Sequence, residues 1–197
     1  TDEQVLINLM PMLVDGVARA HARAVESAIL INGGSVLGLD THATVATGVT
    51  PPTTGGTLTA AHLLSMRTDM GKYGLNPADV VYIVSQDGYF SLLADPDFEN
   101  LNEVGPMATK LTGMIGQVYG SPVIVSDEFP AIATGNPFAF AVHTSSYVIP
   151  RLRGIKVEQD YEVGQQRRII VASQSLGFSE LFDGAPASVS LSYGTVA

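Results

Sequence analysis

The sequence predicts an α+β fold, and three patterns carry that prediction. A long stretch near the N-terminus has helical periodicity, two shorter helical stretches flank a β-branched run, and the C-terminal part alternates polar and apolar residues. The expected order is therefore helix, helix, strand, helix and then several strands. Because helices and strands do not alternate regularly, a repeating βαβ fold is not expected.

Composition is that of a folded chain with a sizeable core. Of the 197 residues, 46% are hydrophobic and 15% are charged, which disfavours disorder. The net charge of −9 repels nucleic-acid phosphates, so a sequence reader of DNA is not expected. The absence of cysteine excludes a disulfide scaffold, a cysteine nucleophile and thiolate metal sites. No run approaches the roughly 18 apolar residues of a membrane span, so no membrane partner is expected.

The N-terminal region predicts two helices. Thr1 and Gln4 match a capping box for a short first helix, and Pro11 suits the first turn of a second one. From 12 to 30 the apolar residues recur at steps of three and four, which predicts the longest helix of the fold. Asn32, followed by two glycines, ends it.

Alanine is frequent on one face of that long helix. Small side chains allow close approach, so we expect Ala20, Ala24 and Ala28 to pack against the strands of 155–178. A larger residue at position 24 would then overpack the contact.

The middle of the chain reads as helix, strand, helix. Residues 35–56 are rich in Gly, Thr, Val and Pro and predict a long connection with one short strand. A helix is expected over 58–70, a β-branched strand over 79–85 and a further helix over 86–94.

Strands dominate the remaining sequence. The stretch 96–112 has no period and predicts a loop or a ragged hairpin, and 121–126 predicts a short buried strand. A strand over 137–144 alternates large and small residues. Residues 147–182 predict long strands with a hairpin turn at Gly164.

The tail 183–197 consists mainly of Gly, Ser, Ala and Val and shows no clear period. No element is assigned to it.

A glycine-rich stretch, "GMIGQVYGSPVIVSD" at 113–127, raises the possibility of a phosphate-binding loop. It has no Lys, and Gly120 leads into Ser121 and Pro122 and then a strand, whereas a phosphate loop opens a helix. We interpret Gly113, Gly116 and Gly120 as turn residues that supply positive φ or close backbone approach.

No pattern predicts catalysis, a metal or a cofactor. The four histidines have neither i,i+4 spacing nor a neighbouring ligand pattern; they are His21, His42, His62 and His143. Asp40-Thr41-His42 is interpreted as turn chemistry. Ser85 and Asp87, at a strand-to-helix junction, are interpreted as helix N-caps rather than as a nucleophile with its partner.

One basic concentration stands out in an acidic chain. It is interpreted as a solvated strand face that pairs with nearby carboxylates. Its members are Arg151, Arg153, Lys156, Arg167 and Arg168, and the carboxylates are Glu158, Asp160 and Glu162.

Four segments in this order resemble the major capsid proteins of tailed bacteriophages with the HK97 fold. They are the alanine-rich helix running into "AILINGG" (28–34), "DVVYIVSQDGYFSLLAD" (79–95), "LTGMIGQVYGSPVIVSDEFP" (111–130) and "RLRGIKVEQDY…RRIIVASQSLGFSELF" (151–182). The resemblance implies a long spine helix, a peripheral domain and an axial domain. It divides the chain into peripheral residues 1–56 with the spine helix, axial residues 57–146 and peripheral return strands 147–197.

The same resemblance implies a structural protein without enzymatic activity. It implies self-assembly into pentamers and hexamers of an icosahedral phage head, with packaged DNA held without sequence-specific contact. Scaffolding, portal or decoration proteins are possible partners, and the protein would assemble in the host cytoplasm and reside in the virion. Subunit-interface candidates lie in the 95–112 stretch, which approaches the capsomer axis in that family; they are Asp97, Glu99, Asn100, Asn102, Glu103 and Lys110.

Alternatives stay open at this level. Encapsulin-like cellular shell proteins resemble the same fold, and a small hydrolase or ligand-binding domain would show itself by a deep pocket with convergent polar groups. Family members also carry an N-terminal arm and an extended loop ahead of the spine helix, whereas this sequence starts almost on that helix. It is either a trimmed core or a minimal variant, and no covalent cross-linking residue is carried over.

Overall fold

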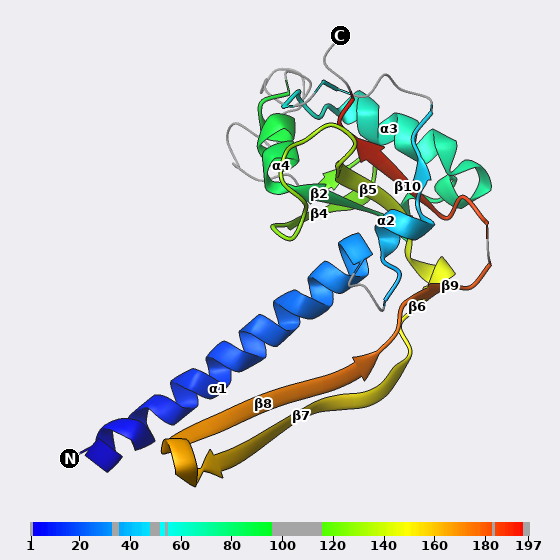
Figure 1. The fold of residues 1–197 in the computed structure, drawn as a ribbon. Coiled ribbons are helices and arrows are strands. Elements are labelled where there is room, and N and C mark those ends of the chain that lie inside the picture. The colour runs from blue at the N-terminus through cyan, green and yellow to red at the C-terminus, as the bar shows by residue number, and fades with distance from the viewer. Residues whose placement is uncertain are drawn as a thin grey trace.

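The computed structural model divides into a head and an arm (Figure 1). The head is a six-stranded sheet with its covering helices, and the arm is helix α1 (Asp2–Ser27) together with the hairpin of strands β7 (Arg151–Glu162) and β8 (Arg167–Leu176). The structure describes residues 2–32, 36–47, 52–53, 55–95, 116–182 and 184–194, with residues 2–10 as backbone.

Helix α1 is the longest helix of the described chain, as the periodicity predicts, but its bounds differ. It runs unbroken through Pro11, where the sequence predicts a junction between two helices. A proline removes one backbone hydrogen bond, and here helical turns on both sides continue past that loss. The final turn, Ala28–Asn32, widens into a π-helix.

Gly38 explains how the chain turns back after α1. A Cβ added at Gly38 would lie 2.5 Å from the backbone nitrogen of Asn32 and 2.9 Å from the carbonyl oxygen of Ile29. Only glycine allows two backbones to approach this closely. The close contact seats the short helix α2 (Leu39–His42) against the π-helical turn.

The sheet of the head has the order β1-β10-β5-β2-β4-β3 and mixes parallel and antiparallel pairs. Strand β5 pairs antiparallel with both β2 and β10, whereas β4 runs parallel to β2, and β1 runs parallel to β10. The strands are β1 (Thr44–Val45), β2 (Val80–Ser85), β3 (Gln117–Val118), β4 (Ser121–Ser126), β5 (Pro137–His143) and β10 (Ser188–Ser192).

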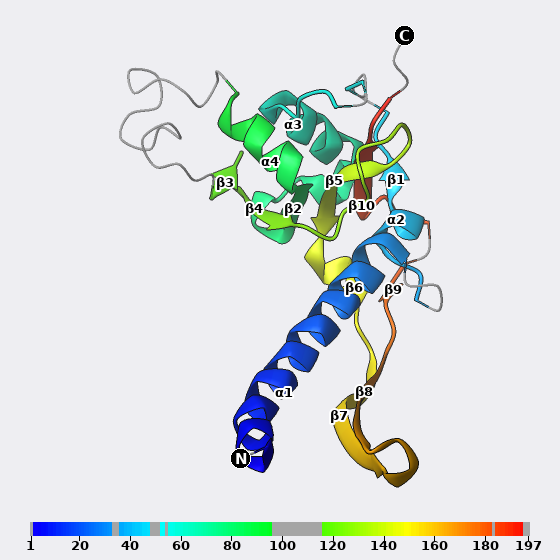
Figure 2. The same ribbon diagram turned by 60° about the vertical axis from the view of Figure 1, so that its left-hand side comes forward.

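Helices α3 (Ala60–Asp69) and α4 (Gln86–Leu93) cover one face of this sheet (Figures 1 and 2). Leu63 and Met66 of α3 and Leu92 of α4 are fully buried against Val84 and Phe138. These helices and β2 lie within two residues of their predicted bounds. Helix α4 begins as interpreted, because the Ser85 hydroxyl accepts a hydrogen bond from the Gly88 N–H at 3.1 Å.

The opposite face of the sheet carries a smaller core where the arm joins the head. Leu30 of the π-helical turn and Leu39 of α2 pack with Phe140 and Val142 of β5. Phe129 stacks on Phe140, with ring centroids 5.6 Å apart. Strand β5 is therefore buried on both faces, and all but its last residue are buried.

Two predictions for the strands are corrected. Strand β4 is only half buried, with Ile124 52% exposed, because β3 covers just its first two residues. Strand β10 lies between β1 and β5 in the sheet, where the sequence predicts no element. Ser188 and Ser190 are buried where β5 pairs along one edge of β10 and β1 pairs with Val189 and Ser190 at the other.

The hairpin of the arm follows the alternating pattern of the sequence. Its turn is Val163–Gln165, and Gln166 takes the left-handed conformation at φ +50, so the strain falls two residues after the predicted Gly164. A narrow neck of strands β6 (Tyr147–Val148) and β9 (Ser179–Glu180) joins the hairpin to the head. The remaining short turns are Gly71–Gly74, Pro77–Asp79 and Thr144–Ser146.

Candidate assembly surface

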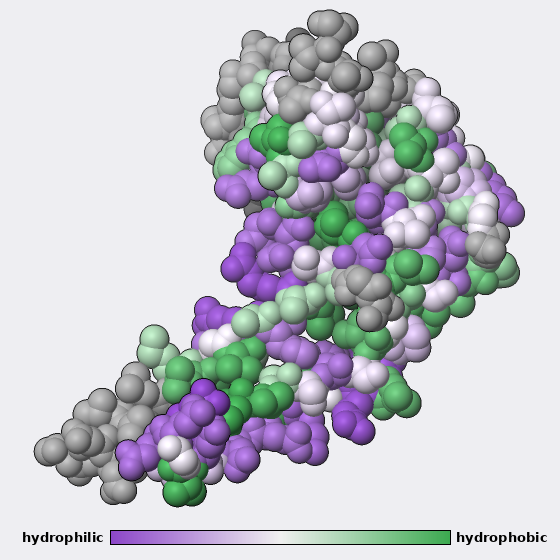
Figure 3. Space-filling model, in the orientation of Figure 1, coloured by the Kyte–Doolittle hydropathy of each residue, from purple (hydrophilic) through white to green (hydrophobic). Residues whose placement is uncertain are grey.

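The arm exposes most of its side chains to solvent. Every residue of β7 except Glu162 is exposed. Leu152 is 89% exposed and Val163 is 76% exposed, and on α1 Met12 is 73% exposed. Figure 3 shows hydrophobic and hydrophilic residues interleaved along this part of the molecule.

Helix α1 contacts the hairpin through a different face from the one predicted. Ala20 and Ala24 are exposed, whereas Val17, His21 and Val25, at steps of four, are half buried. The face toward the hairpin is thus rotated by one residue, and the expected alanine packing is wrong. Alanine spacing alone does not fix helix rotation, because a neighbouring stripe of larger residues has the same period.

A single side-chain bond links the middle of α1 to β8 among the described residues. The His21 Nε2 atom and the Gln174 Oε1 atom lie 2.7 Å apart. Because side chains on a strand alternate, Ile170 and Ala172 share the side of Gln174, and Val157 pairs with Ala172. The side of the hairpin toward α1 is thus the more apolar one, and α1 leaves Val157 44% exposed.

The other side of the hairpin carries most of its charge. Lys156 pairs with Glu158 on the same strand, and the Arg167 Nε atom lies 2.7 Å from Glu162 across the turn. Exposed pairs of this kind contribute at most about 1 kcal/mol to stability. The prediction that the basic cluster pairs with nearby carboxylates is therefore confirmed for these two cations.

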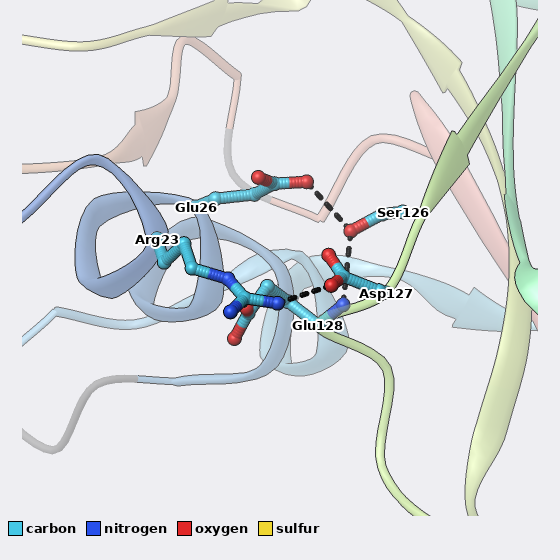
Figure 4. A network of polar contacts seen from close by, with 5 residues as sticks. All are labelled: Arg23, Glu26, Ser126, Asp127 and Glu128. Atoms are coloured by element: carbon cyan, nitrogen blue, oxygen red, sulfur yellow. Dashed lines mark hydrogen bonds and ion pairs between the residues drawn. The ribbon is translucent and has the colours of Figure 1, made fainter. Parts of the chain in front are cut away.

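A network of five polar residues attaches the C-terminal end of α1 to the head (Figure 4). Arg23 pairs with Asp127, and its Nε atom lies 3.1 Å from a Glu128 oxygen. The Asp127 carboxylate raises the pKa of Arg23. The Ser126 hydroxyl donates to Glu26 at 2.6 Å and accepts from the Glu128 N–H at 3.2 Å. The network holds α1 to the residues that follow β4.

A second set of contacts, at the neck, attaches the hairpin to the head. Tyr147 of β6 stacks on Phe178, with centroids 5.2 Å apart, and both rings contact His42. The His42 Nδ1 atom lies 3.7 Å from Glu180, which also accepts from the Gly184 N–H. Burial raises the pKa of Tyr147, whose hydroxyl lies 2.6 Å from that of Ser188. Asp40-Thr41-His42 thus belongs to helix α2 and the neck, rather than to a turn.

The other histidines have structural roles. His62 accepts hydrogen bonds at the start of α3, from the Thr59 N–H at 3.0 Å. His143 lies 2.7 Å from the Ser146 hydroxyl. In the described part of the chain, no group of three or more His, Cys, Asp or Glu side chains could hold a metal.

A cleft beside α3 has one charged side chain in its wall, and hydrogen bonds to the backbone already hold that side chain. This cleft of about 680 Å³ is lined by Leu64, Leu75 and Tyr119 around Arg67. The Arg67 guanidinium donates to backbone carbonyls of Gly74, Leu75 and Tyr119, so it is already used in holding the loop. In the described residues no helix is long and apolar enough to cross a membrane.

The described part of the glycine-rich stretch forms a turn, as the sequence predicts. Gly120 has φ +79 and Tyr119 has φ +50, and together they reverse the chain between β3 and β4. Gly113 lies outside the described residues. So do all six predicted interface residues, which are Asp97, Glu99, Asn100, Asn102, Glu103 and Lys110. The interface prediction for these residues stays a prediction, and the exposure of the arm becomes visible only in the packing.

Comparison with known proteins identifies the fold. The chain is 32% identical over 188 residues to the major capsid protein of Escherichia phage T5; the match covers 92% of this chain and 41% of that protein. The chain thus spans less than half the length of the curated relative that it matches. No protein-family model matches the chain.

Solved structures of capsids and related shells have the same fold. A chain of Mycobacterium phage Che8 superposes with a TM-score of 0.69 at 17% identity, over 90% of this chain and 61% of that one. The capsid of an empty GTA particle also gives 0.69, at 16% identity, over 95% and 67%. The holo-SrpI encapsulin of Synechococcus elongatus gives 0.55 at 16% identity, over 93% and 67%. The HK97-like fold and the relationship to tailed-phage major capsid proteins are therefore confirmed.

Proposed function

We propose that this chain, which has the HK97-like capsid fold and a relative in the T5 major capsid protein, forms the shell of a phage head. Copies assemble into pentamers and hexamers of an icosahedral capsid that encloses DNA. The observation that carries the proposal is the exposed arm, a long helix beside a two-stranded hairpin. The arm is attached to the six-stranded-sheet part of the subunit, which has its own core.

Physical chemistry favours a partner for this arm. A lone two-stranded hairpin is marginally stable in water, because it cannot bury enough apolar surface. The arm exposes Met12, Leu152 and Val163, which a monomer gains nothing by exposing. A stable interface buries about 1,200–2,000 Å² in total, and an extended arm offers such an area without enlarging the core.

The remaining predictions extend this proposal. The protein acts as a structural subunit without catalysis, resides in the virion after assembly in the host cytoplasm, and meets scaffolding, portal or decoration proteins. Residues 1–56, 57–146 and 147–197 correspond to the spine and peripheral part, the axial domain and the peripheral return strands. We expect the six subunit-interface candidates to approach the centre of the ring; they are Asp97, Glu99, Asn100, Asn102, Glu103 and Lys110.

An encapsulin-like cellular shell is the second candidate, favoured by the likeness to the SrpI encapsulin. The two candidates differ in what the shell encloses. A phage head holds DNA, whereas an encapsulin holds a protein cargo.

Electron microscopy of the full-length gene product, expressed with its neighbouring genes, tests the proposal. We expect closed icosahedral particles whose contents absorb as nucleic acid and resist nuclease. Particles that contain a cargo enzyme would favour the encapsulin alternative. A protein that stays monomeric at high concentration, alone and with its neighbouring gene products, would contradict both.

A further inference from the structure

Positive charge is concentrated on the hairpin. Residues 151–168 hold five of the ten Lys and Arg residues and three of the nineteen Asp and Glu residues. The rest of the chain therefore has five basic against sixteen acidic residues, a net charge of −11. A second copy of this chain presents the hairpin with a surface of opposite sign.

The start of β7 is the part of the hairpin that lacks internal partners. Arg151 and Arg153 form no ion pair within the described residues, unlike Lys156 and Arg167. Leu152 between them is 89% exposed. The register of β7 with β8 shifts between Arg151 and Arg153 and again between Arg153 and Lys156. Bulges re-aim side chains and are frequent beside functional sites.

A cleft of about 400 Å³ in the head combines apolar side chains with a carboxylate, which complements the exposed leucine and arginines of β7. Its wall includes Phe90, which is 57% exposed, and Ile132, which is 46% exposed. Asp87, at the first turn of α4, adds an exposed carboxylate that forms no ion pair among the described residues. An apolar wall beside an unpaired carboxylate is the complement of a leucine flanked by arginines.

The two surfaces belong to opposite faces of the sheet. Leu92 of α4 packs in the core on one face, whereas Tyr147 and Phe178, at the neck of the hairpin, pack on the other. In Figure 1, α4 lies above the sheet and β7 leaves the neck below it. One copy therefore does not reach its own cleft, and a contact between the two surfaces joins different copies.

We propose that the Arg151–Leu152–Arg153 segment of one copy docks into the cleft of Asp87, Phe90 and Ile132 on a second copy. Leu152 packs between the two apolar side chains, and Arg153 pairs with Asp87. The contact joins two different patches, so it is head-to-tail and closes into rings when the rotation permits. This inference rests on the proposed function, since it names one of the contacts through which the shell forms.

Such a contact concentrates binding energy in few residues. Arginine is enriched at interface hot spots, where it lies in desolvated pockets beside apolar anchors. Charge reversal on either side should weaken it, and reversal on both sides should restore it.

The experiment is a charge-swap cycle in the full-length gene product. The variants are Arg153→Glu, Asp87→Arg and the pair together, with Lys72→Glu as a matched control on an exposed lysine of the head. Analytical ultracentrifugation measures the concentration at which each self-associates. We expect each single variant to raise it about tenfold or more, and the pair to return within about threefold of wild type. Lys72→Glu should leave it unchanged.

Folding is checked separately, because Asp87 also lies at the start of a helix, where a positive charge is unfavourable. Circular dichroism verifies each variant, and Asp87→Asn removes the charge without reversing it. Asp87→Asn should raise the concentration less than Asp87→Arg does.

Folded single variants that associate like wild type overturn the inference, and so does a folded pair without recovery. The inference is also overturned if Arg153→Glu particles form normally but retain less DNA. That result would indicate that the hairpin binds nucleic acid instead. If the charge swap restores association into rings but closed shells never form, the inference is supported and the proposed function is contradicted. A wild type that never associates contradicts both.

Discussion

Strand β5 of the head is buried, whereas strand β7 of the arm is exposed along nearly its whole length. In the head, β5 has six buried residues in succession, and large side chains such as Phe138 and Phe140 are 2% and 0% exposed. In the arm, β7 intersperses Leu152, Ile155, Val157 and Tyr161 with charged and polar residues, and all but its last residue are exposed. The composition of each strand agrees with its burial, and only the exposed apolar residues of β7 need a further explanation.

The difference lies in what covers each strand. Strand β5 has β2 and β10 at its edges and two separate cores on its faces. Strand β7 has only β8 at one edge, and α1 approaches the hairpin mainly along β8. The head therefore has its own core, whereas the described part of the arm buries few of its apolar side chains within one copy.

The largest expected effect tests the core of the head. Phe140→Ala removes a ring that is 0% exposed and stacked on Phe129, so it should lower the free energy of unfolding by about 3–5 kcal/mol. Denaturant unfolding of the isolated chain measures it. Leu152→Ala in the arm is the matched comparison and should change the same quantity by less than about 0.5 kcal/mol. Equal losses at the two sites would show that the arm is packed in the monomer.

A smaller effect tests the rotation of α1. Val25 is half buried, so Val25→Ala should cost about 1 kcal/mol. Ala24 is exposed, so Ala24→Leu should be tolerated within about 0.5 kcal/mol, although the sequence predicts overpacking there. Thermal unfolding of the two variants compares adjacent positions on one helix. A destabilised Ala24→Leu with a neutral Val25→Ala would restore the alanine face.

The smallest expected effect is a pH dependence confined to the head. Burial lowers the pKa of His62 from 6.5, while Asp95 partly opposes the shift. The folded state thus binds this proton less tightly than the unfolded state does. The stability that neutral His62 contributes is present above about pH 6.5 and is lost as the pH falls toward the lower folded pKa.

Besides burial, protonation would also disrupt the start of α3, where the His62 Nδ1 atom accepts from the Thr59 N–H. Melting temperatures at pH 7.5 and 5.5 should differ less in His62→Gln than in wild type. A wild-type difference that persists fully in His62→Gln would assign the effect to other groups.

The sequence determines those elements whose signals are local. The β-branched run of β2, the serine cap of α4 and the alternation of Phe138 and Phe140 each act within a few residues, so the pattern predicts them. The resemblance adds the fold, which the comparisons confirm. It places the interface in 97–110, which lies outside the described residues.

The tertiary structure decides whatever depends on distant partners. Strand β10 is serine-rich and becomes a strand because β5 and β1 flank it, and Pro11 lies inside a helix that continues on both sides of it. The rotation of α1 follows from where the hairpin lies, and the exposure of β7 from the lack of a second neighbouring strand in the described sheet. Backbone pairing and burial are properties of two segments at once, so the sequence of one segment does not contain them.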